Sequence, residues 1–333
     1  MKNTTISGRD FTDEEICGFV GDLESLPGGE LTVSLLVGCG ERAIAPLREF
    51  LLRGQPRGIF QPRQRAVEAL AQLGAKEVLL EYLSREQDIP DAVARFGEEA
   101  AENTAARELS RWRTEEVYQF VLHLARRRMR VGLIETLGDF ERPESADILL
   151  RALEDDVCRP AAEVALSRIA AQVKSVLLQA AGSYTADGEG SPSELQRRRS
   201  VLRTLSELSL TASDWSVLRP LLRDQDQEIA LLAASMGVEC APVEEKTEAA
   251  RFLIRRIDRA PWFVQIRIQD CLRKNYDKVK DVIVEQLVLR RRLVHGEPLV
   301  NQVVRVLTGI QSSQEQADSQ EEGGHGKREH RTD

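Results

Sequence analysis

The feature that most constrains this chain is a recurring pair of short aliphatic helices, repeated about every 33 residues along most of its 333 residues. The best-formed copy predicts a first helix over 65–74 and a second over 75–83. In the first helix Ala66, Leu70 and Leu73 fall at i, i+4 and i+7, so they share one face. Such self-similarity is typical of arrays of helical repeats. Apolar anchors corresponding to Leu73 lie at Val37, Leu109, Leu137, Ile169, Leu208, Met236 and Cys271.

The remaining copies predict second helices at a comparable spacing. These are expected over 44–52, 117–124, 148–153, 173–178, 217–222, 249–257 and 279–289. The position of Ala66 is polar in two weak copies, where it is occupied by Glu102 and Arg130. No stretch shows the sustained period-2 alternation of strands. We therefore expect an all-α fold, a right-handed α-α superhelix of about seven or eight two-helix repeats.

Two junctions between helix pairs resemble those of a known family. The segments Leu153–Leu166 and Leu222–Ala234 each place aspartates in a turn, ahead of aliphatic and alanine positions of the next helix. An aspartate there can cap the free N–H groups and complement the helix dipole. Both segments resemble HEAT repeats, of the short bacterial type called phycobilisome-lyase HEAT-like repeats. The resemblance covers roughly residues 30–310 and implies a HEAT/ARM-like solenoid with a free face for a partner.

Three segments depart from the repeat. Residues 1–25 are expected to form an acidic N-terminal helix or arm, with Phe11, Ile16 and Phe19 as a docking face. The solenoid is expected over 26–310, with a flexible loop at 182–193 rich in Gly, Ser and Asp. Residues 311–333 contain no large apolar side chain and are expected to be a disordered polar tail.

The charge distribution is uneven along the chain. The formal net charge is −8, and residues 10–30 hold seven acidic side chains and no Lys or Arg. Residues 251–292 hold twelve basic side chains against five acidic ones. An acidic chain is a poor candidate for non-specific nucleic-acid binding. No segment has the apolar length of a membrane span or a signal peptide, so we expect a soluble, cytoplasmic protein without membrane contact.

The sequence offers little catalytic chemistry. Phosphate-binding, zinc-protease and nucleophile-elbow motifs are missing, so we predict no catalytic, cofactor or metal site. The acidic run Glu154-Asp155-Asp156 is interpreted as a helix cap. The five cysteines are odd in number and widely spaced, and they are interpreted as reduced thiols packed as small hydrophobes; they are Cys17, Cys39, Cys158, Cys240 and Cys271.

Clustered arginines are the candidate binding residues. Arginine contacts carboxylate and phosphate groups in a bidentate manner, so an aligned stripe would suit a protein partner with an acidic or phosphorylated segment. The leading hypothesis is a non-catalytic protein–protein interaction scaffold that binds its partner on the concave face, lined by the second helices. The residues predicted to carry binding are Arg251, Arg255, Arg256, Arg259, Arg290, Arg291 and Arg292.

Two other functions stay open. A nucleic-acid-binding or base-excising enzyme of the HEAT-like glycosylase type would use aromatic residues and an Asp in a basic concave groove, and Trp112, Trp215 with Asp214, or Trp262 could serve. Packing between helices is the favoured interpretation of each tryptophan, and the net charge counts against nucleic acid. A bilin or chromophore lyase is suggested by fold analogy alone.

Overall fold

The structure, a computed structural model, describes residues 11–25, 29–182, 191–257, 260–293 and 304–312, except for the side chains of 291–293. The regular structure in these ranges is entirely helical, so the expected all-α fold is confirmed. The chain forms two compact units, and the boundary between them follows residue 172.

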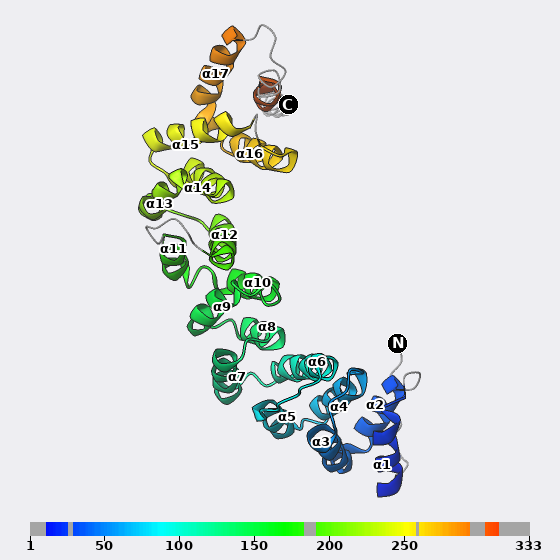
Figure 1. Ribbon diagram of the computed structural model, residues 1–333. Coiled ribbons are helices and arrows are strands. Elements are labelled where there is room, and N and C mark those ends of the chain that lie inside the picture. The colour runs from blue at the N-terminus through cyan, green and yellow to red at the C-terminus, as the bar shows by residue number, and fades with distance from the viewer. Residues whose placement is uncertain (1–10, 26–28, 183–190, 258–259, 294–303, 313–333) are drawn as a thin grey trace, which may run out of the picture. The chain divides into compact units, whose positions relative to one another are not determined.

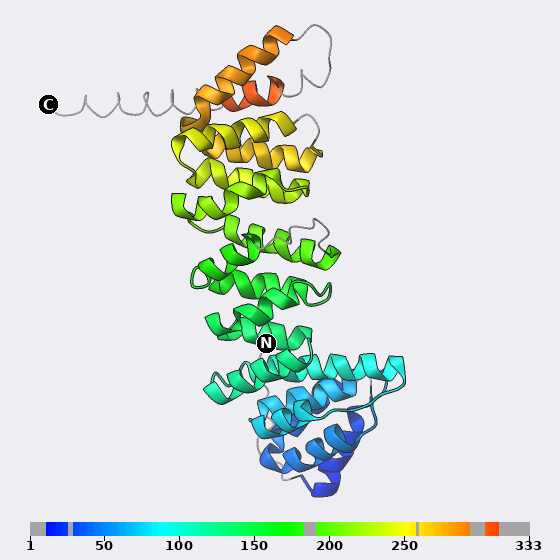
Figure 2. The same ribbon diagram turned by 60° about the vertical axis from the view of Figure 1, so that its left-hand side comes forward.

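The first unit contains two rows of helices. Its first row is α2 (Gly29–Gly38), α4 (Gln61–Gln72), α6 (Ala92–Leu109), α8 (Val131–Phe140) and α10 (Arg159–Ile169), each in contact with the next (Figure 1). Its second row is α3 (Ile44–Arg53), α5 (Lys76–Ser84), α7 (Glu115–Arg127) and α9 (Ala146–Ala152). The helix α6, with 18 residues, extends well beyond its neighbours (Figure 2). At the N-terminal end, α1 (Asp13–Asp22) packs on α2 and α3 through Ile16 and Val20.

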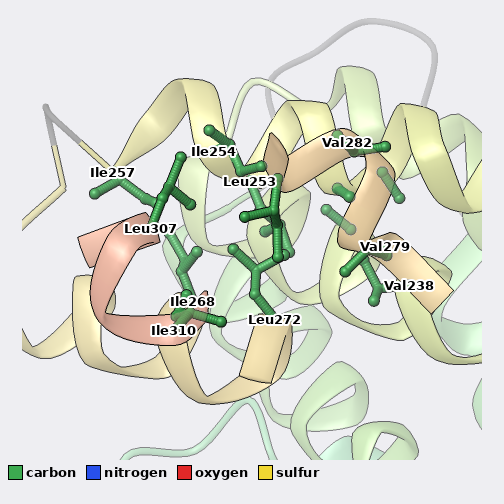
Figure 3. Close-up of a cluster of buried hydrophobic side chains, with 14 of the residues drawn as sticks. Val238, Leu253, Ile254, Ile257, Ile268, Leu272, Val279, Val282, Leu307 and Ile310 are labelled. Carbon is green, nitrogen blue, oxygen red and sulfur yellow. The ribbon is translucent and has the colours of Figure 1, made fainter. Parts of the chain in front are cut away.

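The second unit repeats this plan. Its first row is α12 (Pro192–Ser206), α14 (Gln227–Cys240) and α16 (Trp262–Lys274). Its second row is α11 (Lys174–Gly182), α13 (Ala212–Leu218), α15 (Val243–Arg256) and α17 (Tyr276–Leu293). A further helical segment, 304–312, inserts Leu307 and Ile310 among side chains of α15, α16 and α17 (Figure 3). Residues 311 and 312 are therefore helical, whereas the tail was expected to begin at 311; the rest of that tail lies outside the described residues.

The core of each unit includes the position one turn before each predicted anchor. The position of Leu70, three residues before its anchor, is at most 2% exposed in every copy where it was assigned. Several anchors, including Leu73 and Leu208, are only half-buried. The first-row helices thus direct the i−3 position into the space between the two rows in each of these copies, whereas only half of the anchors are buried. The buried anchors are Leu109, Leu137, Ile169 and Met236, which are at most 3% exposed. The buried side chains at the i−3 position are Leu70, Ala106, Ile134, Leu166, Leu205, Ala233 and Ile268.

One departure from the expected helices has a local cause. The segment 217–222 was expected to be a second helix, but α13 ends at Leu218 and a 3₁₀ helix, Arg219–Arg223, follows. Pro220 explains the change, because proline has no N–H for the α-helical ladder. The polar residues of the two weak copies face each other across one repeat, with Arg130 Nε 3.7 Å from Glu102 Oε2.

Ion pairs join neighbouring helices of the same row. Arg107 of α6 pairs with Glu135 of α8, and Arg168 of α10 pairs with Asp139 of α8 at 2.8 Å. The partners lie 28 and 29 residues apart in the chain. Many of the arginines are thus paired with a carboxylate of the adjacent helix pair. They stabilise the contact between helices, although the sequence alone suggests that they are available for binding.

Candidate interaction surfaces

The predicted arginine cluster is only partly available for binding. Arg251 of α15 pairs with Glu285 of α17 at 2.8 Å. Arg256 stacks on the ring of Phe252, with its guanidinium carbon 3.8 Å from the ring centroid, and burial lowers its pKa. Arg255 is exposed on α15. Arg290 is half-buried on α17, Arg259 lies outside the described residues, and the same holds for the side chains of Arg291 and Arg292.

The tryptophans occupy three different environments. Trp215 is 2% exposed and donates its indole N–H to Glu245, as expected for packing between helices. Asp214 beside it caps α13 and accepts a hydrogen bond of 2.8 Å from Lys174, which lowers the pKa of this carboxyl. Trp112 is half-buried. Trp262 is 72% exposed, so the expectation that it packs between helices is wrong.

The acidic run before α10 has a structural role. Asp155 Oδ1 accepts hydrogen bonds from the backbone N–H groups of Val157 and Cys158, at 3.0 and 2.8 Å. These bonds hold the turn before α10 (Arg159–Ile169), whereas the N-cap residue of this helix, Cys158, makes no side-chain capping hydrogen bond. The acidic run thus has a structural role in the turn, and its interpretation as a helix cap is wrong. Within the ranges that the structure describes, no group of three or more His, Cys, Asp or Glu side chains could hold a metal ion.

The cysteines differ in accessibility. All five are free thiols: Cys158 is buried and Cys17 is exposed. Burial raises the pKa of Cys158 to about 12 and that of Cys271 to about 11. Packing as a small hydrophobe therefore holds for Cys158, whereas Cys17 is exposed on α1.

Exposed apolar side chains gather at the beginning of α16. Trp262, Phe263 and Ile266 are 72%, 54% and 46% exposed. The rings of Trp262 and Phe263 meet edge to face with centroids 6.3 Å apart. We call these three residues the α16 patch. Clustered exposed apolar residues of this kind mark interaction sites more often than a single exposed leucine does.

A cavity of about 480 Å³ lies beside this patch, across the first-row helices α12, α14 and α16. Leu231, Leu232 and Ile268 contribute buried side chains to its lining, and Phe263 belongs to both the cavity and the patch. We call it the α14–α16 groove. Its apolar lining can receive a large apolar side chain of a ligand.

Charged side chains also line the α14–α16 groove. Arg199 and Arg203 of α12 pair with Asp226 and Glu228, respectively, at the beginning of α14. Burial opposes the ionisation of Asp226, but hydrogen bonds from Arg199 and from backbone N–H groups outweigh burial and lower its pKa. Arg267 of α16 is exposed and has no carboxylate within ion-pair distance among the described residues.

The first unit has a related cavity of about 570 Å³ across α6, α8 and α10. Both of its arginines, Arg107 and Arg168, are paired with carboxylates of α8. The exposed valines Val157 and Val164 belong to its lining. Both cavities lie on first-row helices, whereas we expected the second helices to line the binding face.

The sequence contains a signal for the α16 patch, although none of its three residues was predicted to bind a protein partner. Val264 and Ile268 occupy the repeat positions of Ala66 and Leu70; Ile268 is buried in the core, and the partly buried Val264 packs against that core. Trp262 and Ile266 are spaced i, i+4 and precede those inward positions by two residues, so they lie on a different face of the same helix. Large apolar residues outside the inward-facing positions indicate an exposed apolar stripe.

No helix among the described residues is long and apolar enough to cross a membrane. A scan against protein-family models found no match for this chain, and a search of curated proteins also found none.

Proposed function

We propose that this chain is a non-catalytic interaction scaffold built of HEAT-like helix pairs, and that it binds a partner protein through its first-row helices. The observation that carries the proposal is the α16 patch, Trp262, Phe263 and Ile266, beside the α14–α16 groove. Aromatic side chains next to a cavity are the usual anchors of protein interfaces.

The architecture supports the same proposal. Helices contact their neighbours in the row and across rows, and the i−3 positions fill the space between rows. In a solenoid of such pairs the stability comes from neighbouring repeats, which leaves one face of each row free for binding. The HEAT resemblance predicts binding by the second helices, so the first-row surface proposed here departs from that expectation.

Binding would depend on a few anchors and not on the whole surface. Removing an aromatic anchor from the centre of an interface costs about 2 kcal/mol or more, which is about 30-fold in Kd. The competing proposal is an interface on α15 around Arg255. Among the described arginines of the predicted cluster, Arg255 is the one that is exposed.

The test is affinity capture from host lysate, with and without nuclease, read by mass spectrometry. The wild type is compared with Trp262→Ala/Ile266→Ala, with Arg255→Glu/Arg256→Glu, and with the control Val243→Ala, which changes a residue of α15 that is 76% exposed. We expect one defined protein that survives nuclease and is lost only with the α16 variant. Loss with the arginine variant alone would move the interface to α15, and recovery of only nuclease-sensitive material would refute the proposal in favour of nucleic-acid binding.

A further inference from the structure

Among the described residues, one arginine of the α14–α16 groove has no carboxylate partner. Arg199 and Arg203 are neutralised by the carboxylates of α14, whereas Arg267 faces the groove with no carboxylate at ion-pair distance among the described residues. In the related cavity of the first unit, both arginines have such a partner. Arg267 therefore differs from the other arginines that line the two cavities, each of which is paired with a carboxylate.

The apolar part of the groove lies close to this arginine. Ile268 follows Arg267 directly in the chain, and Phe263 precedes it by one turn of α16, so all three contribute to one wall. Leu231 and Leu232 of α14 contribute from the other side. A ligand that fills the groove would thus meet aliphatic and aromatic carbon together with a single available guanidinium.

The chain's own polar tail does not have the chemistry to fill this groove. Residues 313–333 contain several acidic side chains but no large apolar one. A ligand gains binding free energy from an apolar groove by burying apolar surface, at about 25 cal/mol per Å². The tail has almost no apolar surface to bury. The occupant that matches both features carries a large apolar side chain and a carboxylate together.

We propose that the partner presents a short protein segment in which a large apolar side chain enters the α14–α16 groove and a neighbouring carboxylate pairs with Arg267. This inference rests on the proposed function and names the chemistry of the partner. The ring of Phe263, which lines the groove and meets that of Trp262 edge to face, would contact the apolar residue. A carboxylate bound by arginine in a bidentate manner fixes the direction of the segment.

A displayed library of random 12-residue peptides, selected on the immobilised full chain, tests the proposal without a known partner. Enriched peptides are then synthesised with a fluorescent label, and their affinity is measured by fluorescence anisotropy. We expect the enriched sequences to combine a large apolar residue with Asp or Glu. Failure of the selection to enrich peptides, or enrichment of sequences without acidic residues, would overturn the proposal.

Substitutions then locate the contact. Arg267→Glu should weaken the acidic peptides at least tenfold, Arg267→Lys less, and Arg273→Glu, a charge reversal on the same helix outside the groove, should change the affinity less than twofold. A peptide with Lys in place of its acidic residue should bind Arg267→Glu better than it binds the wild type. Equal binding of the acidic peptide to wild type and Arg267→Glu would refute the charge contact.

The same experiment separates the two proposals. If Trp262→Ala abolishes peptide binding while Arg267→Glu does not, the α16 patch is supported as the binding surface and the carboxylate contact with Arg267 is refuted. If neither substitution matters, both proposals fail. Two further measurements name other occupants: Trp262-dependent binding of a 20-nucleotide single-stranded DNA, or a dimer in light scattering that Trp262→Ala dissociates, would each overturn the proposal of a protein segment. Thermal melting by circular dichroism verifies that each variant is folded.

Discussion

Replacement of Glu98 by alanine should cost the first unit several kcal/mol, because it leaves a charged arginine buried. Arg63 of α4 and Glu98 of α6 are each only 4% exposed, with Nε and Oε2 2.7 Å apart. The Arg63 guanidinium also donates to the backbone carbonyls of Leu51 and Gly54, and the Tyr82 hydroxyl donates to Glu98 Oε1 at 2.8 Å. The carboxylate therefore has two donors that lose their acceptor together.

The size of the effect follows from this burial. Removal of one partner from a buried ion pair costs about 3–5 kcal/mol. Tyr82→Phe removes only one hydrogen bond to a charged group and should cost about 1.5–3 kcal/mol. The double change Arg63→Met/Glu98→Leu removes both charges, and apolar replacement of such a pair ranges from neutral to about 1–4 kcal/mol more stable. We therefore expect Glu98→Ala to be the least stable variant, Tyr82→Phe to be intermediate, and the double variant to be at least as stable as the wild type.

Urea unfolding followed by circular dichroism is the assay. Since the chain has two compact units, the transition that shifts with Glu98→Ala is the one to be analysed. The control is Glu49→Ala, which removes one partner of the exposed pair with Arg53, where both side chains are more than half exposed; it should cost at most about 0.5 kcal/mol. If Glu98→Ala costs no more than this control, water reaches Arg63 and our reasoning from burial is refuted.

Three further predictions test other parts of the structure. In alkylation with iodoacetamide at pH 8, Cys17 should react first and Cys158 last, because the thiolate is the reactive form and the pKa of Cys158 is raised to about 12; equal labelling rates by mass spectrometry would contradict this. Asp226→Asn should destabilise the chain most at neutral pH and progressively less below about pH 4. The reason is that a carboxyl with a lowered pKa stabilises the fold when ionised and loses that contribution as it is protonated. A difference in unfolding free energy between wild type and variant that does not narrow on acidification would contradict it. Gly237→Ala should cost about 1–3 kcal/mol, since the added Cβ would lie 2.6 Å from the ring of Trp215; an unchanged melting temperature would show that the ring moves aside.

The helical fold could be predicted because the apolar spacing alone specifies it. The spacing of Ala66 and Leu70 fixes which face of a first-row helix is inward, and the structure buries both residues completely. The prediction of an α-helix over 217–222 was wrong because the aliphatic pattern of a 3₁₀ segment resembles that of an α-helix. Pro220 favours the 3₁₀ form there. Local periodicity thus predicts the helices better than their ends.

The candidate site was harder to predict because it depends on partners distant in the sequence. An arginine such as Arg251 appears free until the residue one repeat later, Glu285, is known to lie opposite it. Trp262 was assigned to packing because it begins a helix with apolar neighbours, and only its position relative to Ile268 shows that it lies on another face. Whether a side chain is exposed depends on how the neighbouring helices pack around it. The apolar pattern of one helix does not contain that information.

The ion pairs along the first rows restrict how this molecule could have grown or could be rebuilt. In each unit a central helix, α8 or α14, supplies carboxylates to basic side chains on both of its neighbours. A tandem duplication of the pair containing α8 would separate Asp139 of the first copy from Arg168, and Glu135 of the second copy from Arg107. Engineers who lengthen or shorten this array should therefore redesign the charged residues at each new junction between first-row helices.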